Sequence, residues 1–233
     1  MTAESTRLAY LEAIGIDVFS LRASEPATGE TRLDDQPVEE SAFEQVSLGW
    51  SELRRAVAAC TRCSLHAGRT QTVFGVGNPA ADWMIVGEAP GVEEDRRGEP
   101  FVGRAGQLLD EMLRAVGLSR EGVFIANILK CRPPNNRDPA ASEAEACRSY
   151  LERQIELVHP KIILAVGRIA AQQLLRSDQT VGRLRGRVHA LANPEIPVVV
   201  TYHPAYLLRT PTQKREAWKD LCLARRIIGA NAA

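Results

Sequence analysis

The sequence has no long hydrophobic run, and no apolar stretch approaches the roughly 18 residues that a membrane span needs. Its N-terminus also lacks the basic segment and apolar block of a secretory signal, since Glu4 and Glu12 interrupt it. We therefore expect a cytoplasmic protein with no membrane partner. There the five cysteines are expected to be reduced thiols, available for a metal, for catalysis or for packing, rather than a disulfide framework.

Net charge is absent as well, because 29 basic residues balance 29 acidic ones. The balance hides an asymmetry: residues 1–48 hold ten Asp and Glu against three Arg, which leaves 26 basic and 19 acidic residues in 49–233. A basic body of this kind attracts phosphate backbones. We predict an N-terminal extension over 1–48, partly disordered, with a short helix at 5–19 and an acidic linker, followed by one domain over 49–233.

Two nucleotide-binding patterns are also missing. The loop 87–95 (GEAPGVEED) follows an apolar run, but no Gly-Lys-Ser/Thr completes a Walker A loop, and the G-x-G-x-x-G pattern is absent. We therefore expect no nucleotide cofactor. The glycines of this loop allow the backbone to approach a ligand closely, and its carboxylates are candidates for holding a metal or orienting water.

Apolar segments alternate with amphipathic ones along 49–233. The apolar segments predict buried strands and the amphipathic segments predict helices, a pattern typical of an α/β fold with a parallel sheet covered on both faces. Strands are expected at 83–87, 123–127, 162–166 and 197–201, and helices at 48–59, 104–117, 142–158, 167–175 and 212–228.

Unusual residues gather where these predicted strands end, which is where ligands bind in open α/β sheets. Asn127 ends the second strand, and its amide offers the donor and the acceptor that suit a base edge. His203 follows the fourth strand, and Phe101 lies in a Gly/Pro-rich loop where an aromatic ring can stack on a base. Each residue alone also fits a turn or the core, so their convergence is the stronger signal. Arginines in loop segments, Arg185 and Arg209 among them, are candidates for phosphate contacts.

Four cysteines have a spacing that suits a metal centre. Cys60 and Cys63 form a C-x-x-C pair where a predicted helix ends, while Cys131 follows the second strand and Cys147 lies in the next helix. Four thiolates hold either zinc or an iron–sulfur cluster. Zinc ribbons usually repeat the C-x-x-C pair, and its absence from the second half of this set favours a cluster. We interpret Cys222, on the last predicted helix, as a buried thiol.

Together these segments resemble the family 4 uracil-DNA glycosylases, the iron–sulfur type. The resemblance spans about 50–228 and is carried by the C-x-x-C pair, GEAPGVEED at 87–95, GEPFVGRAGQLLD at 98–110, ANILKCRPPNNRDP at 126–139, Cys147 and HPAYLLR at 203–209. It implies a three-layer α/β/α fold around a central four-stranded parallel sheet. It also implies a monomeric DNA repair enzyme that flips uracil out of DNA and hydrolyses its N-glycosidic bond, and a structural [4Fe–4S] cluster on Cys60, Cys63, Cys131 and Cys147.

The resemblance also implies roles for individual residues. Phe101 would stack on the flipped uracil, Asn127 would bind its Watson–Crick edge, and His203 would donate a hydrogen bond toward uracil O2. A donor preorganised where the leaving uracil gains negative charge lowers the barrier. Backbone groups of Gly87, Glu88 and Ala89 would line the pocket.

Other roles are less defined by the resemblance. Glu94 would shape the pocket, and Tyr206 or Leu207 would wedge into the base stack that uracil leaves. The best-known uracil glycosylases carry a water-activating Asp where this chain has Ala89. Water activation therefore falls to Glu88, Glu94, Asp95 or the substrate phosphates.

Alternatives remain open from the sequence. One is a non-catalytic iron–sulfur module that binds nucleic acid beside the replication machinery, and another is a zinc protein of unrelated function. A third, the relative that crosslinks to uracil-containing DNA through a His in an extra basic loop, is disfavoured because residues 133–137 (PPNNR) contain no His.

Overall fold

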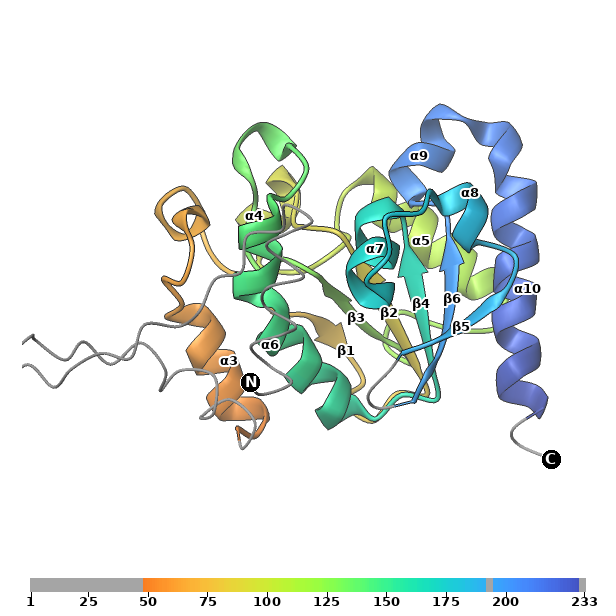
Figure 1. Ribbon diagram of the computed structural model, residues 1–233, viewed down its shortest axis with the longest axis horizontal. Coiled ribbons are helices and arrows are strands. Elements are labelled where there is room, and N and C mark those ends of the chain that lie inside the picture. The colour runs from red at the N-terminus through yellow and green to blue at the C-terminus, as the bar shows by residue number, and fades with distance from the viewer. Residues whose placement is uncertain (1–47, 192–194, 231–233) are drawn as a thin grey trace, which may run out of the picture. The chain divides into compact units, whose positions relative to one another are not determined.

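The computed structural model describes residues 48–191 and 195–230, so the predicted helix at 5–19 and the acidic linker lie outside the described residues (Figure 1). Its centre is a six-stranded sheet in the order β1-β3-β2-β4-β6-β5. The four inner strands run parallel to one another and confirm the four predicted strands. They are β3 (Phe124–Asn127), β2 (Trp83–Gly87), β4 (Ile162–Val166) and β6 (Pro197–Thr201).

Two short edge strands extend the sheet beyond the prediction. β1 (Val76–Gly77) pairs antiparallel with β3, and β5 (Val188–Ala190) pairs antiparallel with β6. The sheet is therefore mixed, with a parallel core. Two or three residues are too few for a period-two pattern to be recognised in a sequence.

Helices cover both faces of the sheet, which confirms the predicted three layers (Figure 1). Alternate residues of β2 face opposite sides, as the strand period requires. Met84 and Val86 pack into one core with Leu53 and Ile155, whereas Trp83 and Ile85 pack into the other. The helices of the first layer are α3 (Trp50–Ala58), α6 (Ala141–Val158) and α7 (Arg168–Leu175), and those of the second are α5 (Arg104–Ala115) and α10 (Lys214–Ala230).

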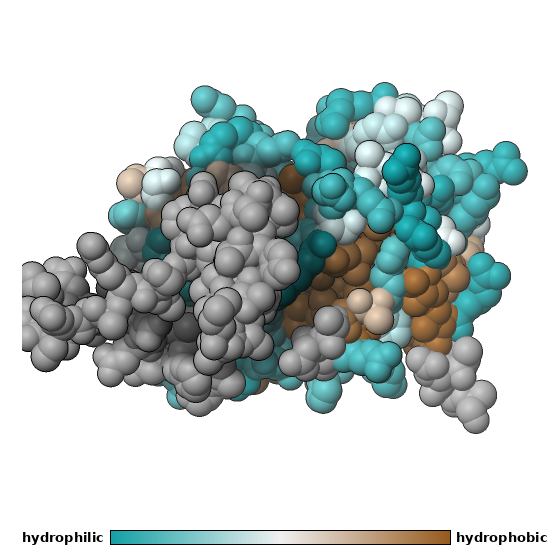
Figure 2. Space-filling view, in the orientation of Figure 1, coloured by the Kyte–Doolittle hydropathy of each residue, from teal (hydrophilic) through white to brown (hydrophobic). Residues whose placement is uncertain are grey.

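Short elements follow the carboxyl ends of the inner strands. Glu94 caps α4 by accepting a hydrogen bond from the Gly91 amide, and Gly98 ends that helix in the left-handed conformation. Pro204 starts α9, where its missing N–H costs nothing. Figure 2 shows hydrophilic side chains along this upper edge of the molecule. The short elements after the strands are α4 (Val92–Arg97), α8 (Val181–Leu184), α9 (Pro204–Arg209) and the 3₁₀ turns Pro134–Asn136 and Pro211–Gln213, whereas the 3₁₀ turn Ser64–Ala67 follows α3.

None of the helices described here combines the length and the apolar character that crossing a membrane requires.

Candidate active site

A cavity of about 790 Å³ opens beyond the carboxyl ends of the parallel strands. Residues that end or follow all four inner strands contribute to its wall, as the convergence of strand ends predicts. The predicted site residues in this wall are Glu88, Ala89, Glu94, Phe101, Asn127, His203, Tyr206 and Arg209.

Gly87, the last residue of β2, permits a close contact between two site residues. A Cβ atom at position 87 would lie 2.4 Å from Oδ1 of Asn127 and 2.5 Å from Cζ of Phe101. Real side chains do not approach so closely, so any residue other than glycine would displace one of these groups. The missing side chain lets the Asn127 amide and the Phe101 ring meet above the strand end.

Phe101 is held in a strained backbone conformation. Its φ of 53° lies in the left-handed region, which a bulky residue rarely adopts. The Glu94 carboxylate fixes the following turn by accepting hydrogen bonds from the amides of Val102 (2.9 Å) and Gly103 (3.1 Å). The Phe101 ring then stacks against the His203 ring, with centroids 5.6 Å apart and planes inclined by 29°.

Asn127 presents an unused acceptor. Its side chain is 2% exposed, and its Oδ1 has no hydrogen-bond partner among the described residues. Leaving a buried acceptor unpaired costs about 1–3 kcal/mol, a cost that a ligand donor removes. The atom lies beside Gly87 and the Phe101 ring, where a flat ring stacked on Phe101 would present its edge.

His203 is arranged as a neutral hydrogen-bond donor. Its Nδ1 accepts a hydrogen bond from the Ala205 amide at 3.1 Å, which places the ring proton on Nε2. Burial and the nearby Arg209 lower the pKa of His203 to about 4, against the opposing effect of Glu94. At neutral pH the ring therefore donates from Nε2 without carrying a charge.

The three candidate carboxylates differ in the hydrogen bonds that they accept. Asp95 is buried and accepts the Thr70 amide on both oxygens, at 3.0 and 3.1 Å. Glu94 is committed to the amides of the α4 cap and the Phe101 turn. The Glu88 carboxylate has no hydrogen bond within the part of the chain that the structure describes, and it lines the cavity.

The surroundings of Glu88 also favour its protonated form. Burial and the nearby Asp138 raise the pKa of Glu88, and Arg168 partly offsets them. Arg168 itself forms an ion pair of 2.5 Å with Asp138, so its charge is shared. A carboxylate with a raised pKa in a cavity is suited to accepting a proton from water.

The structure does not favour Leu207 as a wedge. Leu207 is 1% exposed and packs into the second core, because the helical period of α9 turns positions 204 and 207 inward. Tyr206 is half-buried against the same core and lines the cavity, with its ring 5.0 Å from that of Tyr202. Leu208, the next residue of α9, is partly exposed.

The two arginines predicted to contact phosphates have different surroundings. Arg209 is exposed on the cavity wall. Arg185 is instead bound to α10: its Nε and Nη2 each lie 3.0 Å from the Asp220 carboxylate, and its Nη1 lies 2.9 Å from Glu216. Its side chain is only 13% exposed. The structure thus gives Arg185 a structural role in place of the predicted contact with DNA.

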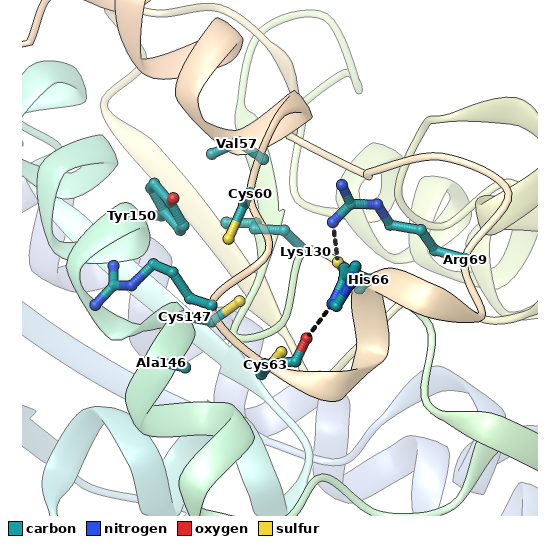
Figure 3. Close-up of a pocket in the computed structure, with 11 residues that line it drawn as sticks. Val57, Cys60, Cys63, His66, Arg69, Lys130, Ala146, Cys147 and Tyr150 are labelled. Atoms are coloured by element: carbon teal, nitrogen blue, oxygen red, sulfur yellow. Dashed lines mark hydrogen bonds between the residues drawn. The ribbon is translucent and has the colours of Figure 1, made fainter. Parts of the chain in front are cut away.

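The four predicted ligand cysteines line one small cavity between the end of α3 and α6 (Figure 3). Arg69 donates a hydrogen bond of 3.1 Å to Sγ of Cys131. Burial raises the pKa of Cys131, and it raises that of Cys147 to about 11 although Lys130 opposes it. Within the described residues, no three His, Cys, Asp or Glu side chains converge as a single metal ion requires.

Sequence reasoning missed two cations that contact this region, one buried and one half-buried. Lys130 is 1% exposed, and its Nζ lies 2.9 Å from the Asn127 carbonyl oxygen and 2.6 Å from Oε1 of Gln154. Its position between Leu129 and Cys131, after an apolar strand, was the available signal. Arg120 donates to the Phe101 carbonyl at 3.2 Å, and its neighbours in the sequence give no such signal.

The fold and the cavity define an α/β protein with an aromatic and amide-lined pocket at the carboxyl edge of a parallel sheet, beside a four-cysteine cavity. The model of the uracil DNA glycosylase superfamily matches residues 74–224. The chain is 45% identical to the type-4 uracil-DNA glycosylase of Archaeoglobus fulgidus over 175 residues, which cover 72% of this chain and 88% of that protein. It is 43% identical to the type-4 enzyme of Pyrobaculum aerophilum over 74% of this chain and 91% of that protein. It is 46% identical to the type-4 enzyme of Thermotoga maritima over 66% of this chain and 80% of that protein.

The chain therefore belongs to the uracil-DNA glycosylase superfamily and, within it, to the type-4 family. This confirms the family that the sequence motifs indicated.

Proposed function

We propose that the cavity around Phe101, Asn127 and His203 is where this uracil-DNA glycosylase of base excision repair binds an extruded uracil and cleaves its N-glycosidic bond. The observation that carries the proposal is the buried Asn127 Oδ1 without a partner, next to the Phe101 ring and above Gly87. A base taken out of the stack brings both the flat face and the edge that these groups lack.

Asn127 supplies selectivity in this proposal. Uracil offers N3–H as a donor and O4 as an acceptor, and the amide of Asn127 offers their complements, Oδ1 and Nδ2. Cytosine reverses both groups on this edge and leaves the amide unpaired. A site built to hydrogen-bond one edge rejects the reversed edge strongly, because its buried polar atoms then lose their partners.

His203 and Glu88 divide the chemistry. When the bond between C1′ and N1 breaks, the electron pair leaves with uracil, and the Nε2–H of neutral His203 stabilises the charge that reaches O2. Water adds its oxygen to C1′, and its proton passes to the Glu88 carboxylate, whose pKa is raised by burial. Glu94 acts on the Phe101 turn as a positioning residue rather than on water.

Cys60, Cys63, Cys131 and Cys147 would hold the [4Fe–4S] cluster that the family implies. The donor set fits this group, because four thiols line one cavity and the cations Arg69 and Lys130 lie against them. Thiolates that carry a cluster are anionic, and these cations offset that charge. The cluster would crosslink α3, the segment after β3 and α6, and so supply stability rather than chemistry at the pocket.

We also propose a monomeric cytoplasmic enzyme in which residues 49–233 form the catalytic domain. The family match at 74–224 falls inside this range, and so do the residues of the cavity wall. Tyr206 and Leu208 would fill the gap that the base leaves, and Arg209 would contact a phosphate beside it.

The test is excision from a uracil-containing oligonucleotide, followed by alkali and a sizing gel. We expect strand scission at uracil from the wild-type protein and none from a matched thymine strand. Binding without scission would support a non-catalytic module and reject the proposal. Iron and zinc analysis of the same preparation distinguishes a cluster protein, which is brown, from a zinc protein, which is colourless.

A further inference from the structure

Lys130 lies between the two cavities of this protein. Its ammonium donates a hydrogen bond of 2.9 Å to the backbone carbonyl of Asn127, the residue whose side chain faces the base pocket. The same lysine lines the cysteine cavity together with Cys131 and Cys147 (Figure 3). One residue thus contacts the candidate base-binding strand end and lines the cavity of the candidate cluster ligands.

The polar surroundings of the ammonium are unusual for a buried charge. Its side-chain hydrogen bonds reach neutral oxygens, those of Asn127 and of Gln154 (2.6 Å), and none of the ion pairs among the described residues includes it. Gln154 is itself fully buried and donates to the Phe74 carbonyl at 2.8 Å, so it is fixed in place. A buried cation without a carboxylate needs negative charge nearby, and Cys131 and Cys147, which line the same cavity, would supply it as thiolates of a cluster.

The segment that carries Lys130 also continues the strand contacts toward the pocket. The amides of Ile128 and Leu129 donate to the carbonyls of Gly87 (2.9 Å) and Glu88 (3.0 Å). Ala89 lines the base pocket, and it also packs against the buried side chains of Leu129, Cys131 and Cys147. Any shift of residues 128–131 is therefore transmitted to the strand end where Asn127 sits.

We propose that Lys130 is a positioning residue, which holds the Asn127 carbonyl and so couples the four-cysteine cavity to base recognition at the end of β3. The proposal rests on the proposed function, since Asn127 matters only if the pocket accepts a base. It gives the four-cysteine centre a second effect besides crosslinking the fold. Cys131 and Cys147 would hold a cluster as thiolates near the ammonium, and the ammonium holds the backbone from which Asn127 projects.

The first test compares Lys130→Met, which keeps the chain length and removes the ammonium, with the control Lys161→Met. Lys161 is an exposed lysine that pairs with Asp82 at the amino end of β4. Iron content and visible absorption establish how much cluster each variant carries. For cluster-loaded Lys130→Met we expect kcat/KM on uracil-containing DNA to fall by about tenfold to a hundredfold, with affinity for undamaged DNA unchanged. Lys161→Met should match the wild type in cluster content, in kcat/KM and in affinity for undamaged DNA.

A structural readout separates positioning from general destabilisation. In Lys130→Met, amide hydrogen exchange should increase in peptides covering 124–130 and stay at the wild-type rate in peptides covering β6. Wild-type protein stripped of iron by a chelator should show the same local increase, which keeps the test valid if the variant loads poorly. Faster exchange throughout the sheet in both samples would reject a specific link.

The two hypotheses fail in different ways. Wild-type protein that releases no uracil rejects the proposed function. An active wild type, together with a loaded Lys130→Met variant of equal kcat/KM and equal exchange, rejects the role of Lys130 alone.

Discussion

The guanidinium of Arg120 donates a hydrogen bond of 3.2 Å to the backbone carbonyl of Phe101. It also donates to the carbonyl of Pro100 and pairs with Asp110 at 3.2 Å. Glu94 binds the amides on the other side of the same turn. The left-handed backbone of Phe101 is therefore held from both directions, by a cation on its carbonyls and by a carboxylate on the following amides.

Replacing Arg120 with Met should release the Phe101 ring from its place over the pocket. We expect kcat/KM for uracil excision to fall by about tenfold to a hundredfold, because a displaced stacking ring no longer orients the base. Steady-state kinetics on a single-uracil duplex measures this. The matched control is Arg114→Met on α5, whose pair with Glu111 is highly exposed and contributes about 0–1 kcal/mol. Equal loss in both variants would contradict the assignment.

Asn127→Ala should abolish base recognition without unfolding the protein. The substitution removes the amide that pairs with uracil, and we expect a loss in kcat/KM of about a hundredfold or more. It also removes an unpaired buried acceptor, which offsets part of the lost packing, so the free energy of unfolding should change by only about 1 kcal/mol. Chemical denaturation alongside the kinetics checks both. A large loss of stability would show that the Asn127 amide supports the fold.

The pH dependence should reflect a His203 that stays neutral. Since its pKa is lowered to about 4, excision should show no loss from this group between pH 8 and pH 6, and it should decline only as pH approaches 4. Between about pH 6.5 and 4 the unfolded chain binds a proton that the native ring does not. The free energy of unfolding should therefore decrease as pH falls through this range. His203→Gln should show a smaller decrease, measured by denaturation at several pH values.

Removing one cysteine from the four-cysteine cavity should have a different outcome from removing Cys222. Cys131→Ala should lower the iron content and colour of the protein and reduce its melting temperature, because the cluster crosslinks separate segments. Cys222→Ala, on α10, should retain the iron and absorption of the wild type. Iron analysis and thermal unfolding test both. Full iron content in Cys131→Ala would remove this cysteine from the ligand set.

Much of the site was predictable because it lies where buried strands end. The runs at 83–87, 124–127, 162–166 and 197–201 are continuous and apolar, as parallel strands buried on both faces must be. Once they form one parallel sheet, Asn127 and His203 must share an edge. The motifs that resemble type-4 enzymes lie at the same strand ends, so local sequence and topology agree there.

Other features depended on contacts that no local pattern contains. Leu207 and Tyr206 are neighbours on a six-residue helix. Only the packing of α9 against the second core decides that Leu207 is buried. Arg185 lies in a loop, yet α10, over thirty residues away, engages its guanidinium.

The sequence by itself determined the parallel core, the family and the four thiols, because strand burial and motif spacing are local properties of the chain. The tertiary structure decided which side chains are free to act. Hydrogen bonds commit Glu94 and Asp95 and leave the Glu88 carboxylate at the cavity, and burial places the Lys130 ammonium against Asn127. Charged and polar groups pair with the partners that lie nearest in space, and the order of residues along the chain does not specify those partners.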